Sequence, residues 1–244
     1  MKKKSFLLIC TMSFFVLIIA LMSSNLFYVK NILIQGDLVY PENITALIHS
    51  EITKNIFLVN KQKIKYIIQT NYPSINVDYS ECFFPDKIII KLSLRQSLYA
   101  LEGEDGFYIL DHDMNIIKKE QAFSSTPDNP IILYGDKIKN GITGMSADTN
   151  KQDYISLLSY SLNEWKTPDE VKSEICSIHL DYTKDNNLLL SFFSGVNIMI
   201  ENSDKNLITK LSSALIYYQT QNVKTGTIKI IDTDQNTLLI YDNN

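Results

Sequence analysis

The sequence predicts an α+β protein: an N-terminal transmembrane helix, a block of order β-α-α-β-β, and a mostly antiparallel β-domain with packed helices. Three observations lead to this prediction. An uncharged apolar run lies near the N-terminus, apolar residues then recur at alternating helix and strand spacings, and a series of short strand patterns follows. We therefore expect a cytoplasmic tail (1–4), a transmembrane helix (5–24), a first extracytoplasmic domain (27–101) and a β-domain (102–244).

Composition limits the classes of function. The chain has 244 residues, of which 45% are hydrophobic and 20% charged, values typical of a folded protein. Lys2, Lys3 and Lys4 are the only charged residues before position 25, so the rest carries a net charge of −7. An acidic body argues against nucleic acid as the ligand, because phosphate binding needs a basic face. A disulfide-stapled fold is not expected, although one bridge between Cys82 and Cys176 stays open.

Residues 5–24 contain no charged side chain, and as a helix they extend roughly 30 Å, the thickness of the hydrocarbon core of a bilayer. The three preceding lysines favour a cytoplasmic N-terminus and an extracytoplasmic body. The alternative is a cleaved signal peptide, whose apolar core usually has about 7–15 residues and ends at a small-x-small site. The apolar run over 6–22 is longer and ends without Ala-x-Ala, which favours an uncleaved single span.

The first extracytoplasmic domain should contain three strands and two helices. In order, the patterns predict a strand over 27–35, a helix over 44–52, a helix after Asn60, and strands over 75–80 and 87–94. Pro41 can open the first helix, and Pro73 ends the second. Phe84, Pro85 and Asp86 form the last turn. Two helices on one face of a three-stranded sheet make up a POTRA module.

In these segments the chain resembles the FtsQ/DivIB family of cell-division proteins. The resemblance rests on 27–36 directly after the anchor, on the connector 55–60, on 72–75 with the turn 84–88, and on 108–111 with 116–117. It covers most of the chain and is strongest over 27–118. The family's Glu-Arg-x-Pro pattern keeps only Arg95 here, and the glycine that follows the family's aspartate is absent after Asp111.

The β-domain should end on an exposed strand. We expect strands over 107–110, 116–118, 130–134, 175–182, 188–193, 196–200, 227–231 and 237–241, helices over 155–165 and 203–218, and a loop over 135–148. The candidate site is the last strand, Thr237, Leu238, Leu239, Ile240 and Tyr241, as an edge that offers backbone groups to an incoming strand. The residues alone equally allow Leu238 and Ile240 to pack inside. The resemblance implies that this end receives a coiled-coil partner of the FtsB/DivIC type.

No catalytic, cofactor or metal site is expected. Asp111, His112 and Asp113 could suggest a metal or general-base cluster, but they occupy a predicted hairpin turn, where Asp is favoured for backbone reasons. The sequence has no cysteine pair at metal spacing, no nucleophile elbow and no phosphate loop. These observations predict a protein that is not an enzyme and binds no small-molecule substrate.

The resemblance implies a scaffold of the bacterial division machinery in the plasma membrane at the septum. Such a protein links single-span division proteins of the FtsB/DivIC and FtsL type and influences septal peptidoglycan synthesis. The alternative is a membrane-anchored extracytoplasmic enzyme or sensor. A POTRA protein of outer-membrane assembly would need a barrel, for which the helices expected over 150–165 and 203–221 leave no room.

Overall fold

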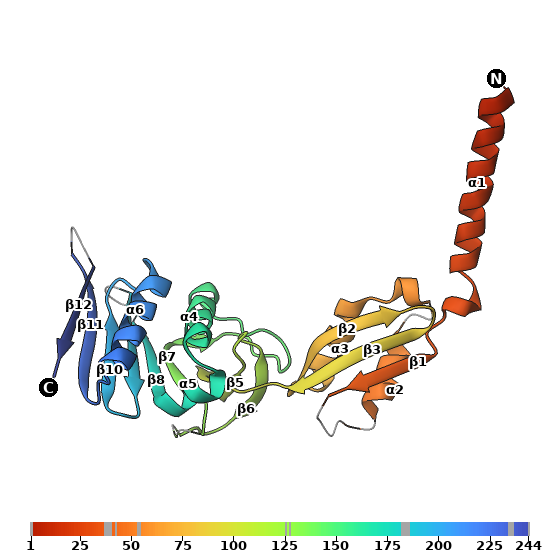
Figure 1. Cartoon of the computed structure of the whole chain (residues 1–244). Coiled ribbons are helices and arrows are strands. Elements are labelled where there is room, and N and C mark those ends of the chain that lie inside the picture. The colour runs from red at the N-terminus through yellow and green to blue at the C-terminus, as the bar shows by residue number, and fades with distance from the viewer. Residues whose placement is uncertain are drawn as a thin grey trace. The chain divides into compact units, whose positions relative to one another are not determined.

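A computed structural model describes residues 2–36, 41, 43–52, 55–124, 126, 128–181, 186–233 and 237–243. It is a mixed α+β protein, as the sequence predicted (Figure 1). Contacts divide the chain into two compact units, Met1–Leu94 and Arg95–Asn244.

The N-terminal helix α1 (Lys2–Met22) has an apolar surface on all sides over its second half. Every large apolar side chain from Met12 to Leu21 except Ile18 is more than half exposed. A search of the described residues finds no helix that is both long and apolar enough to cross a membrane. The predicted span, 5–24, includes residues 5–10, whose side chains lie outside the described set.

The elements of the first unit follow the predicted β-α-α-β-β order. After the short helix η1 (Asn25–Phe27) come β1 (Asn31–Gln35), α2 (Asn43–Glu51), the 3-10 turn η2 (Ile56–Leu58), α3 (Lys61–Asn71), β2 (Ile75–Phe83) and β3 (Lys87–Leu94). In the described residues the strands form one sheet of order β1-β3-β2, with β1 parallel and β2 antiparallel to β3. The predicted first strand began too early, because the chain makes the η1 turn before it extends at Asn31.

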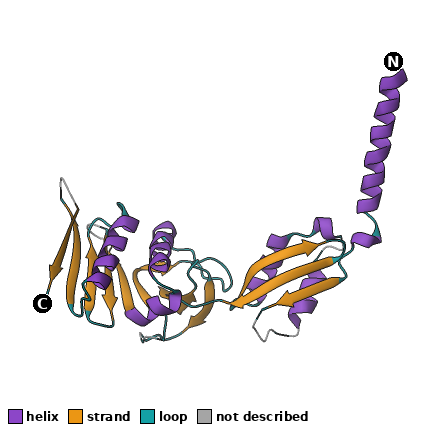
Figure 2. Cartoon of the chain, viewed as in Figure 1, coloured by secondary structure: helices purple, strands orange, loops and turns teal. Residues whose placement is uncertain are grey.

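The core of the first unit lies between its helices and its sheet. Figure 2 shows α2 and α3 on one side of the three strands. The buried residues are Ile44, Ile48, Ile64, Ile68, Ile75, Val77, Ile88, Ile90 and Leu92. As predicted, Asn60 caps α3: its Oδ1 accepts a hydrogen bond from the backbone N–H of Lys63 at 3.1 Å, which satisfies one free donor of the first turn.

The second unit is built on one large, mostly antiparallel sheet. Its elements are β4 (Tyr99–Gly103), β5 (Gly106–Leu110), β6 (Ile116–Glu120), β7 (Ile131–Ile138), α4 (Gln152–Trp165), α5 (Pro168–Glu174), β8 (Ile175–Asp181), β9 (Asn187–Phe192), β10 (Val196–Ile200), α6 (Leu207–Thr220), β11 (Gly226–Asp232) and β12 (Thr237–Asp242). In the described residues the strand order is β12-β11-β10-β9-β8-β7-β4-β5-β6. Buried side chains of α4, α5 and α6 form a single core with this sheet.

Four features of this unit differ from the sequence predictions. Strand β4 was not predicted, because it lies inside the sheet and buries Tyr99, Ala100 and Leu101, so it lacks the alternation of a half-exposed strand. The domain boundary therefore falls after Leu94 and not after residue 101. Strand β7 continues to Ile138 through what was predicted as loop, and α6 begins at Leu207, later than expected.

The first residue of the second unit, Arg95, forms a buried ion pair with Asp111. Nη1 of Arg95 lies 3.2 Å from Oδ2 of Asp111, and the two side chains are 2% and 5% exposed. The geometry is that of an ion pair without a hydrogen bond, since among the described residues neither Nε nor Nη1 of Arg95 finds a hydrogen-bond partner. Asp111 Oδ1 also accepts from the backbone N–H groups of Asp113 (2.9 Å) and Asn115 (2.8 Å). Asp111 therefore holds the β5–β6 turn and neutralises a buried cation.

We expect Asp111→Ala to destabilise the second unit by about 3–5 kcal/mol, because it leaves the Arg95 guanidinium buried without a counter-charge. The neighbouring His112→Ala is the control, with an expected change within about 0.5 kcal/mol because its side chain is half exposed. Urea unfolding of residues 25–244 measures the free-energy change in both variants, with the fluorescence of Trp165, the only tryptophan, as the probe. Equal losses in the two variants would contradict this role of Asp111.

Candidate functional site

The predicted site strand forms β12, which stands at one end of the large sheet (Figure 1). In the described residues β12 pairs with β11 alone, antiparallel, in a register that joins Leu238 to Ile231 and Ile240 to Lys229. The side chains of Leu238 and Ile240 are 47% and 44% exposed. The question that the sequence left open is thereby answered for these two side chains, since neither packs inside.

The other face of β12 attaches the strand to the core. Leu239 and Tyr241 are partly buried and pack against the hydrophobic core of the unit. The hydroxyl of Tyr241 donates to the backbone carbonyl of Thr225 at 2.7 Å, and its ring lies 6.3 Å from that of Tyr217 on α6. Because alternate residues of a strand point to opposite faces, Leu239 and Tyr241 hold the strand while Leu238 and Ile240 remain accessible.

A buried lysine fixes the start of the β11–β12 hairpin. Lys210 on α6 is 4% exposed, and its Nζ donates to the carbonyls of Glu201 (3.0 Å) and Asn202 (2.9 Å) and to Oδ2 of Asp232 (2.6 Å). Oδ1 of Asp232 accepts from the hydroxyl of Thr237, the first residue of β12, at 3.0 Å. The hydrogen bond from Lys210 lowers the pKa of Asp232, because it stabilises the ionised carboxylate.

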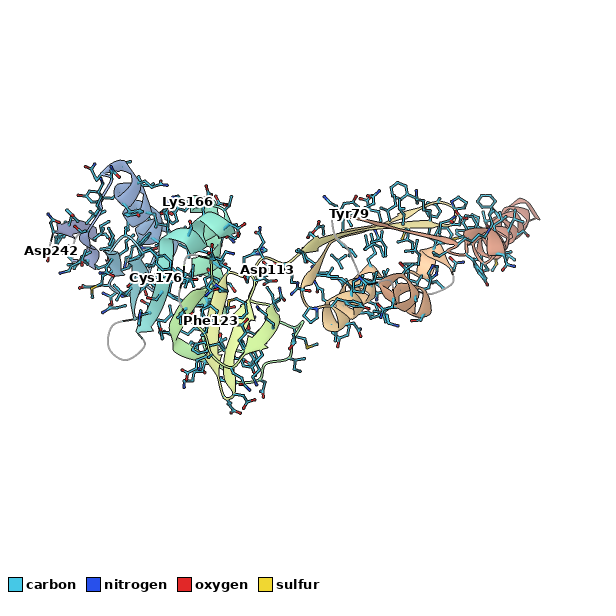
Figure 3. All side chains as sticks on the ribbon, turned by 90° about the horizontal axis from the view of Figure 1, so that it is seen from below. Tyr79, Asp113, Phe123, Lys166, Cys176 and Asp242 are labelled. Atoms are coloured by element: carbon cyan, nitrogen blue, oxygen red, sulfur yellow. The ribbon has the colours of Figure 1, made fainter. Side chains whose placement is uncertain are left out.

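A glycine permits the close approach of the far end of β12. Gly226, the first residue of β11, has φ +98°, a value that L side chains rarely adopt. A Cβ atom at this position would lie 2.4 Å from the backbone carbonyl oxygen of Asp242. Only glycine therefore lets β11 and β12 pair along their full length. Figure 3 labels Asp242 at the margin of the second unit.

The opposite edge of the sheet is protected by charge. Strand β6 carries Lys118 and Lys119, whose Nζ atoms each lie 2.6 Å from a carboxylate oxygen, of Glu120 and Asp105 respectively. Charged side chains, lysine above all, are a common means of preventing an edge strand from pairing with another chain. Strand β12 instead exposes Leu238 and Ile240. The two ends of the sheet therefore differ in the side chains that they expose.

A row of side chains crosses the open face of the sheet from β12 to β7. The register places next to one another Ile240, Lys229, Met199, Leu189, His179 and Tyr134. Their neighbours along β9 and β10 are buried on the helical side, so this row lies on the face without helices. The row was not predicted, although three consecutive apolar residues in 188–190 and 198–200 indicate strands that are apolar on both faces.

Four residues of this row line a hollow of about 370 Å³. Its lining consists of Tyr134, Gly135, His179, Leu180, Asn187, Leu189 and Met199. The rings of Tyr134 and His179 stack with centroids 4.4 Å apart. Partial burial lowers the pKa of His179, which favours the neutral imidazole. These lining residues include no carboxylate, and Leu180, Leu189 and Met199 supply apolar surface, so the hollow can accept an apolar side chain.

The remaining sequence candidates do not converge on a site. Asp111 belongs to the buried ion pair, whereas the side chains of His112 and Asp113 are exposed in the turn. Nε2 of His112 lies 3.4 Å from Oδ1 of Asp113. In the described part of the chain no group of three or more His, Cys, Asp or Glu side chains could hold a metal ion. Cys82 and Cys176, between which the sequence left one bridge open, are not joined in a disulfide.

Comparison with models of known protein families finds no match, and no curated protein matches significantly. Among solved structures, the chain is similar to the major extracytoplasmic domain of the trans isomer of the bacterial cell division protein DivIB from Geobacillus stearothermophilus. The identity is 16% and the TM-score 0.33, and the match covers 54% of this chain and 99% of that domain. A likeness of this strength does not establish membership of a family.

We expect Gly226→Ala to loosen β12, because the added methyl group meets the carbonyl of Asp242. Gly195→Ala is the matched control: Gly195 also has a positive φ, +88°, but its Cβ would meet nothing within 4 Å. Amide hydrogen exchange should speed up about tenfold or more over 237–243 in Gly226→Ala only, a change of roughly 1.4 kcal/mol in local opening. Equal exchange over 237–243 in the two variants would contradict the clash between residue 226 and Asp242.

The pairing of Asp232 with Lys210 also predicts a pH dependence. Because the folded-state pKa of Asp232 is lowered, its contribution to stability is complete above the ordinary value of 3.8 and is lost as the pH falls through the folded value. The difference in urea midpoint between the parent and Asp232→Asn should therefore be constant near neutral pH and shrink below pH 3.8. The Trp165 fluorescence of residues 25–244 gives both midpoints. A difference that stays constant down to pH 3 would contradict the assignment.

Proposed function

We propose that the chain is a membrane-anchored scaffold, not an enzyme, which captures a partner by adding one strand of that partner to β12. The observation that carries the proposal is the state of β12: an edge strand fixed on one face by Leu239 and Tyr241 and accessible at Leu238 and Ile240. Strand addition supplies affinity through backbone hydrogen bonds and specificity through alternate side chains.

Each side-chain contact of the proposed interface contributes little free energy, so we expect a modest affinity that is built up from several contacts. Complete burial of a leucine or isoleucine side chain gains about 1.5–3 kcal/mol, so covering the exposed half of Leu238 or Ile240 gains roughly 1 kcal/mol each. A partner that continued over Met199 and Leu189 would bury further apolar surface on the open face. The Tyr134–His179 hollow gives such a partner a place for one large apolar side chain.

The anchor is proposed for α1. A helix that is apolar on all sides is normally buried, in a protein core or in a membrane. From Met12 to Leu21 the large apolar side chains of α1 are exposed on several sides of the helix, which supports a lipid surrounding. With Lys2, Lys3 and Lys4 before it, the proposed orientation has a cytoplasmic N-terminus and an extracytoplasmic body.

The division role follows from the resemblance of the sequence to the FtsQ/DivIB family. The matching segments occupy defined places in the fold: 55–60 form η2 and the cap of α3, and 84–86 form the β2–β3 turn. On this basis the partners are coiled-coil division proteins of the FtsB/DivIC and FtsL type, and the site of action is the septum. The first unit is proposed as a POTRA domain.

The test places lysine on β12, as β6 has naturally. In the double variant Leu238→Lys with Ile240→Lys, we expect binding of the FtsB/DivIC-type partner to residues 25–244 to weaken at least about tenfold, because two apolar contacts are replaced by desolvated charges. The control is Leu157→Lys with Ile208→Lys, which changes side chains of almost equal exposure, 46% and 42%, on α4 and α6. Titration calorimetry with the purified partner measures both.

The urea midpoint of each double variant, followed by Trp165, shows that the unit stays folded. Equal affinity of the β12 variant and the control would overturn strand addition at β12. An unchanged affinity in both, together with a division defect of the β12 variant in cells, would favour the alternative of an enzyme or sensor whose site lies elsewhere.

A further inference from the structure

Three phenylalanines from separate segments of the first unit form one cluster. The centroid distances are 5.1 Å between Phe27 and Phe57, 5.0 Å between Phe57 and Phe84, and 6.4 Å between Phe27 and Phe84. Phe27 ends η1, Phe57 lies in η2 and Phe84 begins the β2–β3 turn. Rings at these separations and angles are in favourable tilted or edge-to-face contact.

The cluster is exposed and not part of the core. The side chains of Phe57 and Phe84 are 40% and 63% exposed, and those of the neighbouring Leu26 and Leu58 are 57% and 67% exposed. We call these residues, with Phe27, the aromatic patch. The core of this unit lies elsewhere, between the sheet and α2 and α3. A contiguous exposed patch of large apolar side chains usually marks a surface that something else covers.

The backbone holds the patch rigidly. Tyr28 and Asn55 form a β-bridge that joins the segments of Phe27 and Phe57. The carbonyl of Asp86 accepts from the backbone N–H groups of Lys30 (2.9 Å) and Asn31 (3.2 Å), which attaches the β2–β3 turn to the same segment. Figure 1 shows this turn and the beginning of β1 at the same end of the sheet.

The end of the three-stranded sheet that carries the aromatic patch is attached to the last residue of α1. Nδ2 of Asn55 donates to the backbone carbonyl of Met22 at 2.6 Å. Phe27 follows Met22 by five residues, which extend no more than about 18 Å. If α1 crosses the bilayer, the aromatic patch can therefore reach only the interface at which the helix leaves it.

We propose that the aromatic patch inserts into the headgroup region of the membrane and holds the first unit against the bilayer. This inference rests on the proposed anchor. Phenylalanine and leucine side chains are favoured at the boundary of headgroups and acyl chains, where they bury apolar surface without losing backbone hydrogen bonds. Lys30 and Lys87, each three residues after a phenylalanine of the patch, supply cations next to the lipid phosphates.

The test uses the full chain in vesicles of phosphatidylcholine that carry bromine on the acyl chains, which quench tryptophan on contact. Phe84→Trp and, separately, Leu58→Trp place the probe in the aromatic patch, and Leu58 lies outside the ring cluster, so its replacement leaves those contacts intact. Tyr79→Trp is the control, since Tyr79 is 40% exposed on β2 but about 13 Å before Phe83 along the strand. The signal of Trp165 in the parent is subtracted.

We expect the probes in the aromatic patch to be quenched at least about threefold more than the control probe. If the parent chain floats with the vesicles but the patch probes are quenched no more than Tyr79→Trp, the insertion is refuted and the anchor remains. If the parent chain does not float with the vesicles, the anchor fails, and the insertion fails with it. A patch that served to dock another protein would give the first of these two results.

Discussion

One asymmetry in a single strand underlies the proposed function. Among the described residues, β12 is bonded to the sheet along one side and packed to the core on one face, and its other face exposes Leu238 and Ile240. A strand at the end of a sheet that is held by backbone pairing alone would open readily. Leu239 and Tyr241 prevent this, because their burial and the hydrogen bond from Tyr241 to Thr225 fix the strand in place. The strand is therefore already held in place in the free chain, and in the proposed strand addition this would lower the entropic cost of binding.

The rest of the second unit positions that strand. Helix α6 packs under β10 and β11 and supplies Lys210, whose buried ammonium joins the end of β10, the end of β11 and, through Asp232, the start of β12. Gly226 lets the two last strands come together at the other end of the hairpin. Charge on β6 and apolar residues on β12 then distinguish the two ends of one sheet, and the proposed strand addition uses this difference.

Much of this fold could be predicted from local patterns. The helices of the first unit have apolar residues at helical spacing and clear ends, Asn60 at one and Pro73 at the other. The edge position of the last strand was also predicted, although from its place near the C-terminus and not from any property of Leu238 or Ile240. Strand β4 escaped because a strand buried on both faces has no alternation. The role of Lys210 could not be predicted either, because a lysine on a helix is normally solvated, and only the tertiary fold brings Asp232 to it.

Amide hydrogen exchange can detect whether a partner pairs with the backbone of β12, as we propose. The exchange of residues 25–244 is compared without and with a saturating FtsB/DivIC-type partner. We expect the added protection to be largest over 237–243 and to extend to 196–200 and 187–192 on the open face, while α4 is unchanged. Protection centred on α4 or on the first unit, with 237–243 unaffected, would contradict it.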